Sequence, residues 1–421
     1  MATTRKRVKT SCYRSRVMGR SRVFYGWVVV GAGAVIVSMG LGAMFALAVF
    51  VKPIEDTMGW SRAGISTIAL LNWIAMGLGS FLWGILSDRV GTRGVVLAGG
   101  SLLGLGLVLS SQVGALWQLY VTFGVAVGLG AGAFYAPLTS VATKWFDARR
   151  GLAVALVSGG IGLGVFTVAP LARELTTLYG WRVAMLLLGD LAWLVILPLA
   201  LLIREQPGEV GVAVRDARER EFSAVTVLKA PQFWVIALTH FACCAAHSGP
   251  IFHMVTHAID QGIPALAAAS VLGISGLVSI GGRIMTGVLA DRFGAKRTLI
   301  VGLVAQAVMV FTYLFAHDLR AFVAIALLFG LAYGGVMPLY ALVTREYFGE
   351  KVMGTAYGAV FLISTLGMGL GSFAGGWFYD HLGGYTWLFL SSAAIGGAAA
   401  VLALSFRPRV HVTLAAAVAS R

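Results

Sequence analysis

The sequence is poor in charge and in cysteine, and these shortages exclude several classes of protein. Only 12% of the 421 residues are charged, acidic residues number 17, and cysteine occurs three times, as Cys12, Cys243 and Cys244. Three cysteines at these spacings provide neither a disulfide framework nor a zinc site. The sequence also has no P-loop, no HExxH motif and no convincing GxSxG motif. We therefore expect no enzyme activity, no cofactor and no bound metal.

Apolar residues dominate what remains, at 58% of the chain, with a mean hydropathy of +0.86. A soluble protein could not bury that much apolar surface, so the sequence predicts that a lipid bilayer surrounds most of the chain. The net charge of +15 would favour nucleic-acid binding in a soluble protein. Here the basic residues are scattered between apolar spans, so we expect no nucleic-acid partner.

Apolar spans of about twenty residues recur along the chain and predict an all-α membrane protein with twelve transmembrane helices. The first six cover 25–50, 64–86, 94–112, 116–143, 151–172 and 182–203. The second six cover 233–257, 264–289, 298–316, 320–343, 354–379 and 385–406. The expected division is a basic tail at 1–22, six-helix halves at 23–203 and 231–406, a linker at 204–230 and a tail at 407–421.

Loop charges predict the orientation. The first tail, the central linker and the 87–93, 144–150 and 291–297 loops are rich in Arg or Lys, whereas the intervening loops carry few basic residues. By the positive-inside rule, both termini are expected in the cytoplasm.

The two halves repeat one another. Gly84-Ile-Leu-Ser-Asp88-Arg89-Val-Gly-Thr-Arg93 matches Gly287-Val-Leu-Ala-Asp291-Arg292-Phe-Gly-Ala-Lys296, 203 residues later. Trp145-Phe146 before Gly151 likewise matches Tyr347-Phe348 before Gly354. Two matches in register indicate a duplicated six-helix unit, and parallel repeats are one recurrent design of secondary transporters.

The 84–93 and 287–297 stretches resemble the loop signature of the major facilitator superfamily, which occurs between the second and third helices and again between the eighth and ninth. The resemblance implies the twelve-helix fold of that family and transport by rocking of two halves, with the monomer as the functional unit. We expect the following motif residues to act in the conformational switch: Gly84, Asp88, Arg89, Arg93, Gly287, Asp291, Arg292, Lys296, Arg149 and Arg150.

A narrower resemblance is to the monocarboxylate and oxalate–formate porters. Residues 145–153, WFDARRGLA, are similar to the motif that opens the fifth helix in those porters, although the motif prefers Tyr at 145, Lys at 148 and Gly at 155. Tyr25-Gly26-Trp27 resembles the core of the first-helix motif, without the acidic residue expected before it. These departures place the chain nearer the bacterial branches and imply a bacterial inner membrane.

Arg283 is the single residue that most clearly indicates a substrate site. It precedes Asp291 by eight residues and so lies about 12 Å inside the helix end. An Arg near the centre of a lipid-exposed helix costs about 2.5–3.5 kcal/mol on insertion scales, so its side chain should face a cavity or a partner. The other half has Ser80 at the matching position, so the fold itself needs no cation there. A guanidinium can grip a carboxylate with two hydrogen bonds, and the porter resemblance implies that Arg283 binds the substrate carboxylate; the alternative is a structural arginine.

The proton carrier is less clearly marked. Many monocarboxylate porters have an Asp one turn before this arginine, and Ser279 stands there instead. Histidine titrates near neutral pH, and the seventh span contains His240, His247, His253 and His257. The resemblance favours His253 as a substrate-contacting residue, and His253, His257 and the intramembrane Asp190 are the candidates for proton coupling. The alternative for each histidine is a structural role in the core.

Weaker candidates complete the expected substrate site. They are Tyr135 on the fourth helix, Tyr333 and Tyr340 on the tenth, Asn72 on the second and Phe45 on the first, with packing as the alternative role. A single cation in the cavity suits a monoanion better than a dianion. The sequence therefore predicts a secondary transporter of small organic anions, most simply proton-coupled symport of a lactate- or pyruvate-type monocarboxylate. The alternatives are a carboxylate antiporter, an exporter of other small compounds and a non-transporting membrane sensor.

Overall fold

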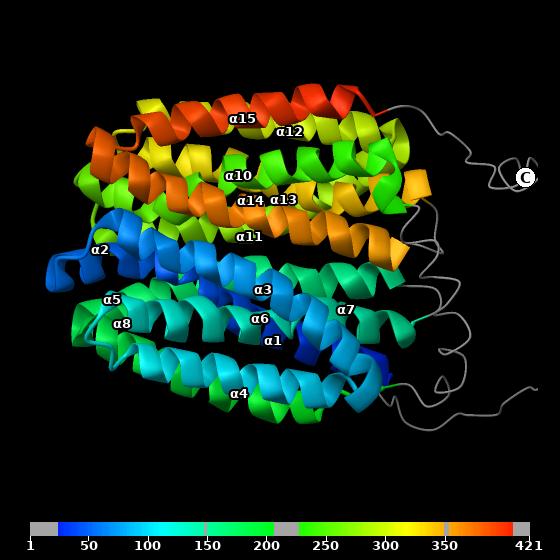
Figure 1. The fold of residues 1–421 in the computed structure, drawn as a ribbon, viewed down its shortest axis with the longest axis horizontal. Coiled ribbons are helices and arrows are strands. Elements are labelled where there is room, and N and C mark those ends of the chain that lie inside the picture. The colour runs from blue at the N-terminus through cyan, green and yellow to red at the C-terminus, as the bar shows by residue number, and fades with distance from the viewer. Residues whose placement is uncertain (1–23, 147–149, 206–226, 349–352, 407–421) are drawn as a thin grey trace, which may run out of the picture.

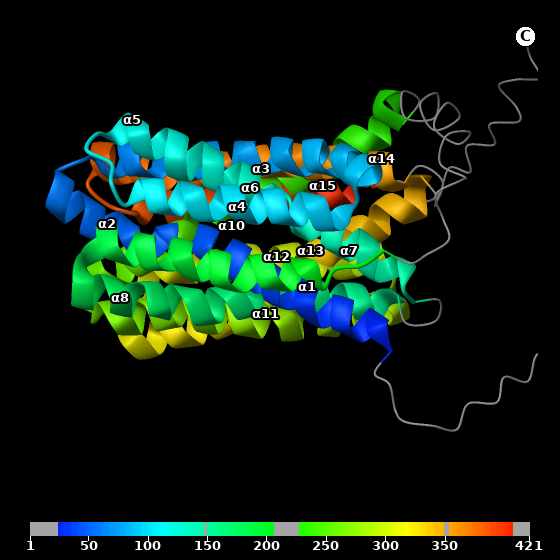
Figure 2. The same cartoon turned by 90° about the horizontal axis from the view of Figure 1, so that it is seen from below.

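The computed structural model describes residues 24–146, 150–205, 227–348 and 353–406, and these residues form helices and short connections without a β-strand. Figure 1 shows the helices lying roughly parallel in one bundle, and Figure 2 shows the same bundle from below. The first set is α1 (Tyr25–Phe45), α2 (Leu47–Met58), α3 (Arg62–Val90), α4 (Thr92–Ser110), α5 (Leu116–Leu119), the π-helical η1 (Tyr120–Val127), α6 (Gly128–Gly132), α7 (Tyr135–Lys144) and α8 (Arg150–Leu201). The second set is α10 (Pro231–Asp260), α11 (Ala265–Phe293), α12 (Ala295–Thr312), the 3₁₀ turn η2 (Tyr313–Phe315), α13 (Leu319–Phe348), α14 (Met353–Leu382) and α15 (Thr386–Leu404).

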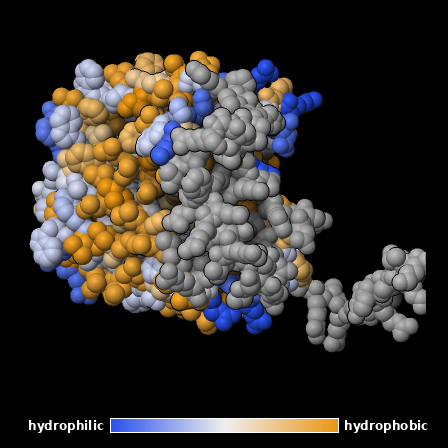
Figure 3. All heavy atoms as spheres, turned by 45° about the vertical axis from the view of Figure 1, so that its right-hand side comes forward, coloured by the Kyte–Doolittle hydropathy of each residue, from blue (hydrophilic) through white to orange (hydrophobic). Residues whose placement is uncertain are grey.

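Twelve crossings follow from these elements. Eleven helical stretches of the described chain are long and apolar enough to span a membrane. One of them, Leu152–Leu201, is 50 residues long and turns back at Gly180, whose φ of 79° and ψ of 162° are not helical. It therefore supplies two crossings, and the predicted twelve-helix fold is confirmed. Figure 3 shows apolar residues gathered over the middle of the bundle surface, as an integral membrane protein requires.

The loop signatures form the tight turns that their glycines predict. α3 ends at Gly91 with φ 82°, and α11 ends at Gly294 with φ 87°, a backbone conformation that favours glycine. The next helix begins one residue later in both places. The fourth predicted span, in contrast, is not one regular helix. It breaks just before α7, where Pro137 has no N–H to donate to the preceding turn.

Helices approach closely where glycines face a neighbouring backbone. A Cβ atom added to Gly164 would lie 2.1 Å from the Ser38 carbonyl oxygen, which places α8 directly against α1. A Cβ atom on Gly162 would lie 2.3 Å from the Gly276 carbonyl oxygen, across the boundary between the two helix sets. Small residues permit such close packing in lipid, where the hydrophobic effect does not drive helix association.

The two helix sets are packed at one end and part toward the other. α3 and α14 touch at Arg62 and Gly376, and again at Gly77 and Thr365. Further along the same strip of α3, Phe81 is 65% exposed, and a Cβ atom on Gly358 of α14 would meet nothing within 4 Å. We call the packed end the Arg62 end. The opposite end, where the described chain begins at Phe24 and stops at Phe406, is called the terminal end.

Candidate functional site

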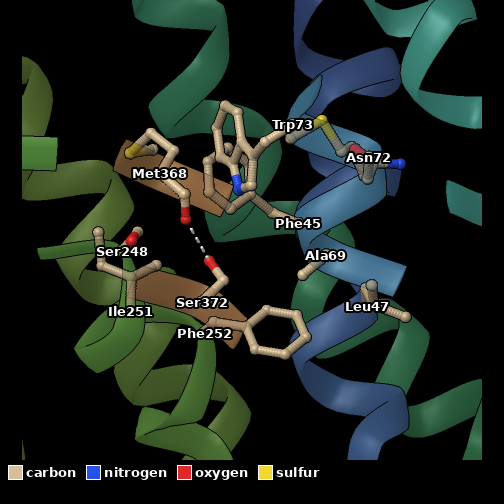
Figure 4. Close-up of a pocket in the computed structure, with 11 residues that line it drawn as sticks. Phe45, Leu47, Ala69, Asn72, Trp73, Ser248, Ile251, Phe252, Met368 and Ser372 are labelled. Carbon is tan, nitrogen blue, oxygen red and sulfur yellow. Dashed lines mark hydrogen bonds between the residues drawn. The ribbon is translucent and has the colours of Figure 1, made fainter. Parts of the chain in front are cut away.

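Two small cavities lie between the helix sets, and they share Phe45 and Ile251 in their walls. The first has a volume of about 20 Å³ and the second of about 10 Å³. Each has room for about one water molecule, so the helix sets must separate further for a carboxylate to enter. Figure 4 shows the first cavity, with Asn72 and Trp73 on one side, Ser248 and Ile251 on the other, and Ser372 between them. Ser275, Ser279 and Tyr333 line the second cavity.

Arg283 lies on α11 and reaches across the boundary between the helix sets. Its Nη1 donates a hydrogen bond to the carbonyl oxygen of Ser158 on α8, and the residue is half-buried. Among the described residues, no carboxylate forms an ion pair with it. The cation predicted within the membrane is therefore held by a neutral carbonyl and has donors left for an anion.

Two of the predicted tyrosines lie near Arg283. Tyr135 at the start of α7 and Tyr333 on α13 both lie within electrostatic range of its charge. Tyr333 also lines the second cavity, as does Ser279, whose hydroxyl donates to the Gly276 carbonyl at 2.6 Å. The structure thus gathers Arg283, Tyr135, Tyr333 and Ser279 in one region.

Asn72 and Phe45 lie closer to the Arg62 end. Asn72 lines the first cavity, and its amide nitrogen donates to the Phe123 carbonyl oxygen at 2.9 Å within the first helix set, while its amide oxygen has no partner among the described residues. Phe45 packs edge-on against Trp73, with ring centroids 5.7 Å apart, and separates the two cavities. Both residues therefore border the space between the helix sets.

Tyr340 lies elsewhere, inside the second helix set. Its ring stacks on His240 at 3.9 Å and its hydroxyl donates to the Thr239 carbonyl oxygen at 3.3 Å. His247 is also buried there, and its Nδ1 lies 2.7 Å from the Cys243 carbonyl oxygen. These contacts are those of core residues, and neither Tyr340 nor His240 lines either of the two cavities described above.

Two of the candidate histidines, His253 and His257, lie at the Arg62 end. His253 is fully buried and contacts the Tyr385 hydroxyl and the Ser372 carbonyl oxygen. His257 packs against Tyr385 and Phe389, and its Nε2 has no partner in the described chain. The third proton-coupling candidate, Asp190, is exposed on α8 and lines neither cavity.

A buried arginine that the sequence analysis passed over organises the Arg62 end. Arg62 is 1% exposed, and its guanidinium donates to Glu55 at 2.9 Å and to both oxygens of Asp260 at 2.6 and 3.0 Å. It also donates to the Tyr385 hydroxyl at 2.8 Å and lies 3.6 Å above the Tyr379 ring. Glu55 belongs to the first helix set, whereas Asp260, Tyr379 and Tyr385 belong to the second.

The switch motifs occupy the terminal end in matching positions. Arg93 donates to the Ile203 carbonyl oxygen at 3.0 Å, and Lys296 donates to the carbonyl oxygens of Leu404 and Phe406. Each motif thus ties its loop to the last helix of its own set. Gly84 and Gly287 have open space around them, and Asp291 and Arg292 are exposed. Arg149 and the side chains of Asp88, Arg89 and Arg150 lie outside the described part of the structure.

Comparison with known proteins agrees with this arrangement. The family model described as "Major Facilitator Superfamily" matches residues 30–372 and, in a second match, residues 284–418. Monocarboxylate transporter 3 of Rattus norvegicus is 31% identical over 381 residues, which cover 87% of this chain and 76% of that protein. The uncharacterised MFS-type transporter YhjX of Escherichia coli (strain K12) is 28% identical over 348 residues, 81% of this chain and 84% of that protein.

Solved structures show the same fold. The crystal structure of a bacterial homologue of the human lysosomal transporter Spinster, inward-facing and unoccupied, superposes with a TM-score of 0.72 at 16% identity. The match covers 92% of this chain and 99% of the other.

Proposed function

Because this chain belongs to the major facilitator superfamily and is a transporter rather than an enzyme, we propose that it carries small monocarboxylates across the membrane by alternating access. Its curated relatives include several monocarboxylate transporters at 28–31% identity over most of the chain. The rocking of two six-helix halves, 23–203 and 231–406, moves the substrate site from one side of the membrane to the other. The monomer is the proposed functional unit.

The observation that carries the proposal is the setting of Arg283. A permanently charged group within the membrane is held by one neutral carbonyl across the boundary between the helix sets, with no described acidic partner. A substrate carboxylate supplies the missing charge and accepts two parallel hydrogen bonds from the guanidinium. Ser279 and Tyr333 line the second cavity, and the charge of Arg283 acts on both Tyr135 and Tyr333. These observations support the proposal that the three hydroxyl groups contact the rest of a small, oxygen-bearing anion.

The proposed orientation of the protein in the membrane is based on the charges of its loops. The 87–93 and 291–297 loops lie at the terminal end and are basic, which by the positive-inside rule supports a cytoplasmic position for this end. The Arg62 end then faces the outside, and the helix sets are closed toward the outside and parted toward the cytoplasm. A bacterial inner membrane is the proposed location.

We further propose that one proton accompanies each anion. Uptake of a lone anion against 100 mV costs about 2.3 kcal/mol, equivalent to a roughly fifty-fold concentration penalty. A co-transported proton removes this penalty because the net movement of charge becomes zero.

Transport into proteoliposomes tests both statements. Purified protein should take up labelled lactate or pyruvate, and an inwardly directed proton gradient should accelerate this uptake several-fold without an imposed voltage. Uptake that ignores the gradient but rises strongly with carboxylate inside the vesicle would indicate an antiporter. Liposomes without protein provide the background for passive entry of the undissociated acid, which a proton gradient also increases.

A further inference from the structure

The contacts around Arg62 join the two helix sets at the Arg62 end. Glu55 on α2 and Asp260 at the end of α10 bind the same guanidinium from opposite sets. Asp380 on α14 reaches the other way and accepts from the backbone N–H groups of Arg62 and Ala63 at 3.2 and 2.7 Å. These bonds cap the beginning of α3 with a carboxylate from the second set. The sets cannot separate at this end while the bonds hold.

His253 is tied into this network by hydrogen bonds that define its neutral form. Arg62 donates to the Tyr385 oxygen, so the Tyr385 O–H remains free to donate to His253 Nδ1, 3.1 Å away. The proton of His253 then lies on Nε2, which donates to the Ser372 carbonyl oxygen at 2.9 Å. Ser372 lines the first cavity. One chain of contacts thus runs from Arg62 through Tyr385 and His253 to the cavity wall.

A second proton on His253 conflicts with this arrangement. Protonated Nδ1 must donate, so the Tyr385 oxygen would accept from two cations, Arg62 and His253, and its own proton would lose this acceptor. A charge on His253 is also disfavoured because the side chain is fully buried in a low-dielectric interior. Separation of the helix sets relieves the conflict because it hydrates both cations.

We propose that Arg62, Glu55 and Asp260 form a latch that closes the substrate pathway at the Arg62 end, and that protonation of His253 releases it. His253 is a positioning residue, acting on Arg62 through Tyr385. The role of the latch in transport rests on the proposed function, whereas its opening can be measured without any substrate. The titratable and charged groups facing the latch are Lys52, Glu55, Asp56, His253, His257, Asp260, Tyr379, Asp380 and Tyr385.

Spin-label distances between the two sets test the latch. Gln112 and Arg320 are exposed at the Arg62 end, one in each set; both are replaced by cysteine and labelled, with Cys12 changed to serine. Pulsed dipolar spectroscopy at about pH 7.5 should give one short-distance population. The Asp260→Asn variant should shift the ratio of long to short distances at least tenfold. The control is Asp56→Asn, because Asp56 pairs with Lys52 on the same helix and does not join the sets; it should leave the distances unchanged.

The pH dependence tests the trigger. A histidine in water has a pKa of about 6.5, so lowering the pH from about 7.5 to 5.5 should multiply the open-to-closed ratio roughly tenfold. His253→Gln keeps a donor and an acceptor but cannot be protonated in this range, and it should abolish this response. His257→Gln, which alters the neighbouring histidine, should preserve it.

An Asp260→Asn protein that stays closed contradicts the latch, and a His253→Gln protein that still opens with acid contradicts the trigger. Monodisperse elution in gel filtration shows that each variant is folded.

Discussion

Replacement of Arg283 by alanine is expected to abolish carboxylate transport while leaving the protein folded. The guanidinium makes one hydrogen bond in the described structure, to the Ser158 carbonyl oxygen, and pairs with no described carboxylate. Its removal therefore leaves no buried acid uncompensated, and the helix sets remain packed through Gly162 and Gly276. The substrate carboxylate, in contrast, loses its counter-charge in a low-dielectric site. Uptake of labelled lactate or pyruvate by proteoliposomes should fall to the level of empty vesicles.

Arg283→Lys separates the effect of charge from that of geometry. Lysine keeps the positive charge but loses the planar pair of donors that matches a carboxylate. Loss of a hydrogen bond to a charged group costs about 1.5–3 kcal/mol, so the KM should rise roughly ten- to hundred-fold. A variant with unchanged KM would show that Arg283 does not hold the carboxylate.

Arg182 offers a matched control for this series. It also lies on a membrane helix and donates to a backbone carbonyl, that of Ser111 at 3.1 Å, but both groups belong to the first helix set. Arg182→Lys should transport at nearly the normal rate. If Arg182→Lys and Arg283→Lys lose transport equally, a structural role for both arginines replaces the proposed carboxylate site.

The fold was predictable from the sequence because its strongest signals are local or repeated. Long apolar runs can be found by counting residues along the sequence. The duplicated loop signature shows how the two halves correspond, without any knowledge of packing. Arg283 was found in the same way, because a cation inside an apolar run has a large desolvation cost. Its side chain contacts the Ser158 carbonyl across the boundary between the helix sets and lines neither of the two cavities described, so its role as the carboxylate ligand stays a prediction.

The network at the Arg62 end could not be found in this way. Arg62 and Asp260 lie at the ends of apolar runs. A charge at such a position is ordinarily solvated, so it does not indicate a buried or functional group. They are 198 residues apart, and their bond depends on how the two helix sets meet. The one available sign was that Arg62 is a cation in a loop region otherwise poor in basic residues. The histidines of α10 could be identified in the sequence. Their helical spacing, however, does not tell which neighbouring residues, such as Arg283 or Tyr385, each face of α10 contacts.

Replacement of Gly164 by leucine is expected to disrupt the first helix set. A Cβ atom at Gly164 would lie 2.1 Å from the Ser38 carbonyl oxygen and 2.9 Å from its carbon, and both belong to the backbone of α1. A backbone cannot move aside as a side-chain tip can, so α1 and α8 must separate along their contact. Overpacking of this kind costs about 1–3 kcal/mol, and a rigid neighbour places the change at the upper end. The midpoint of heat-induced loss of the monodisperse gel-filtration peak should fall by several degrees.

Gly31 on α1 provides the control, because a Cβ atom there would meet nothing within 4 Å and the residue is exposed. Gly31→Leu adds the same bulk and the same apolar surface to a lipid-facing position, and it should leave the midpoint nearly unchanged. The contrast separates steric conflict at the α1–α8 contact from any general effect of replacing glycine in a membrane helix. Equal stability of the two leucine variants would mean that α1 and α8 do not pack backbone to backbone at Gly164.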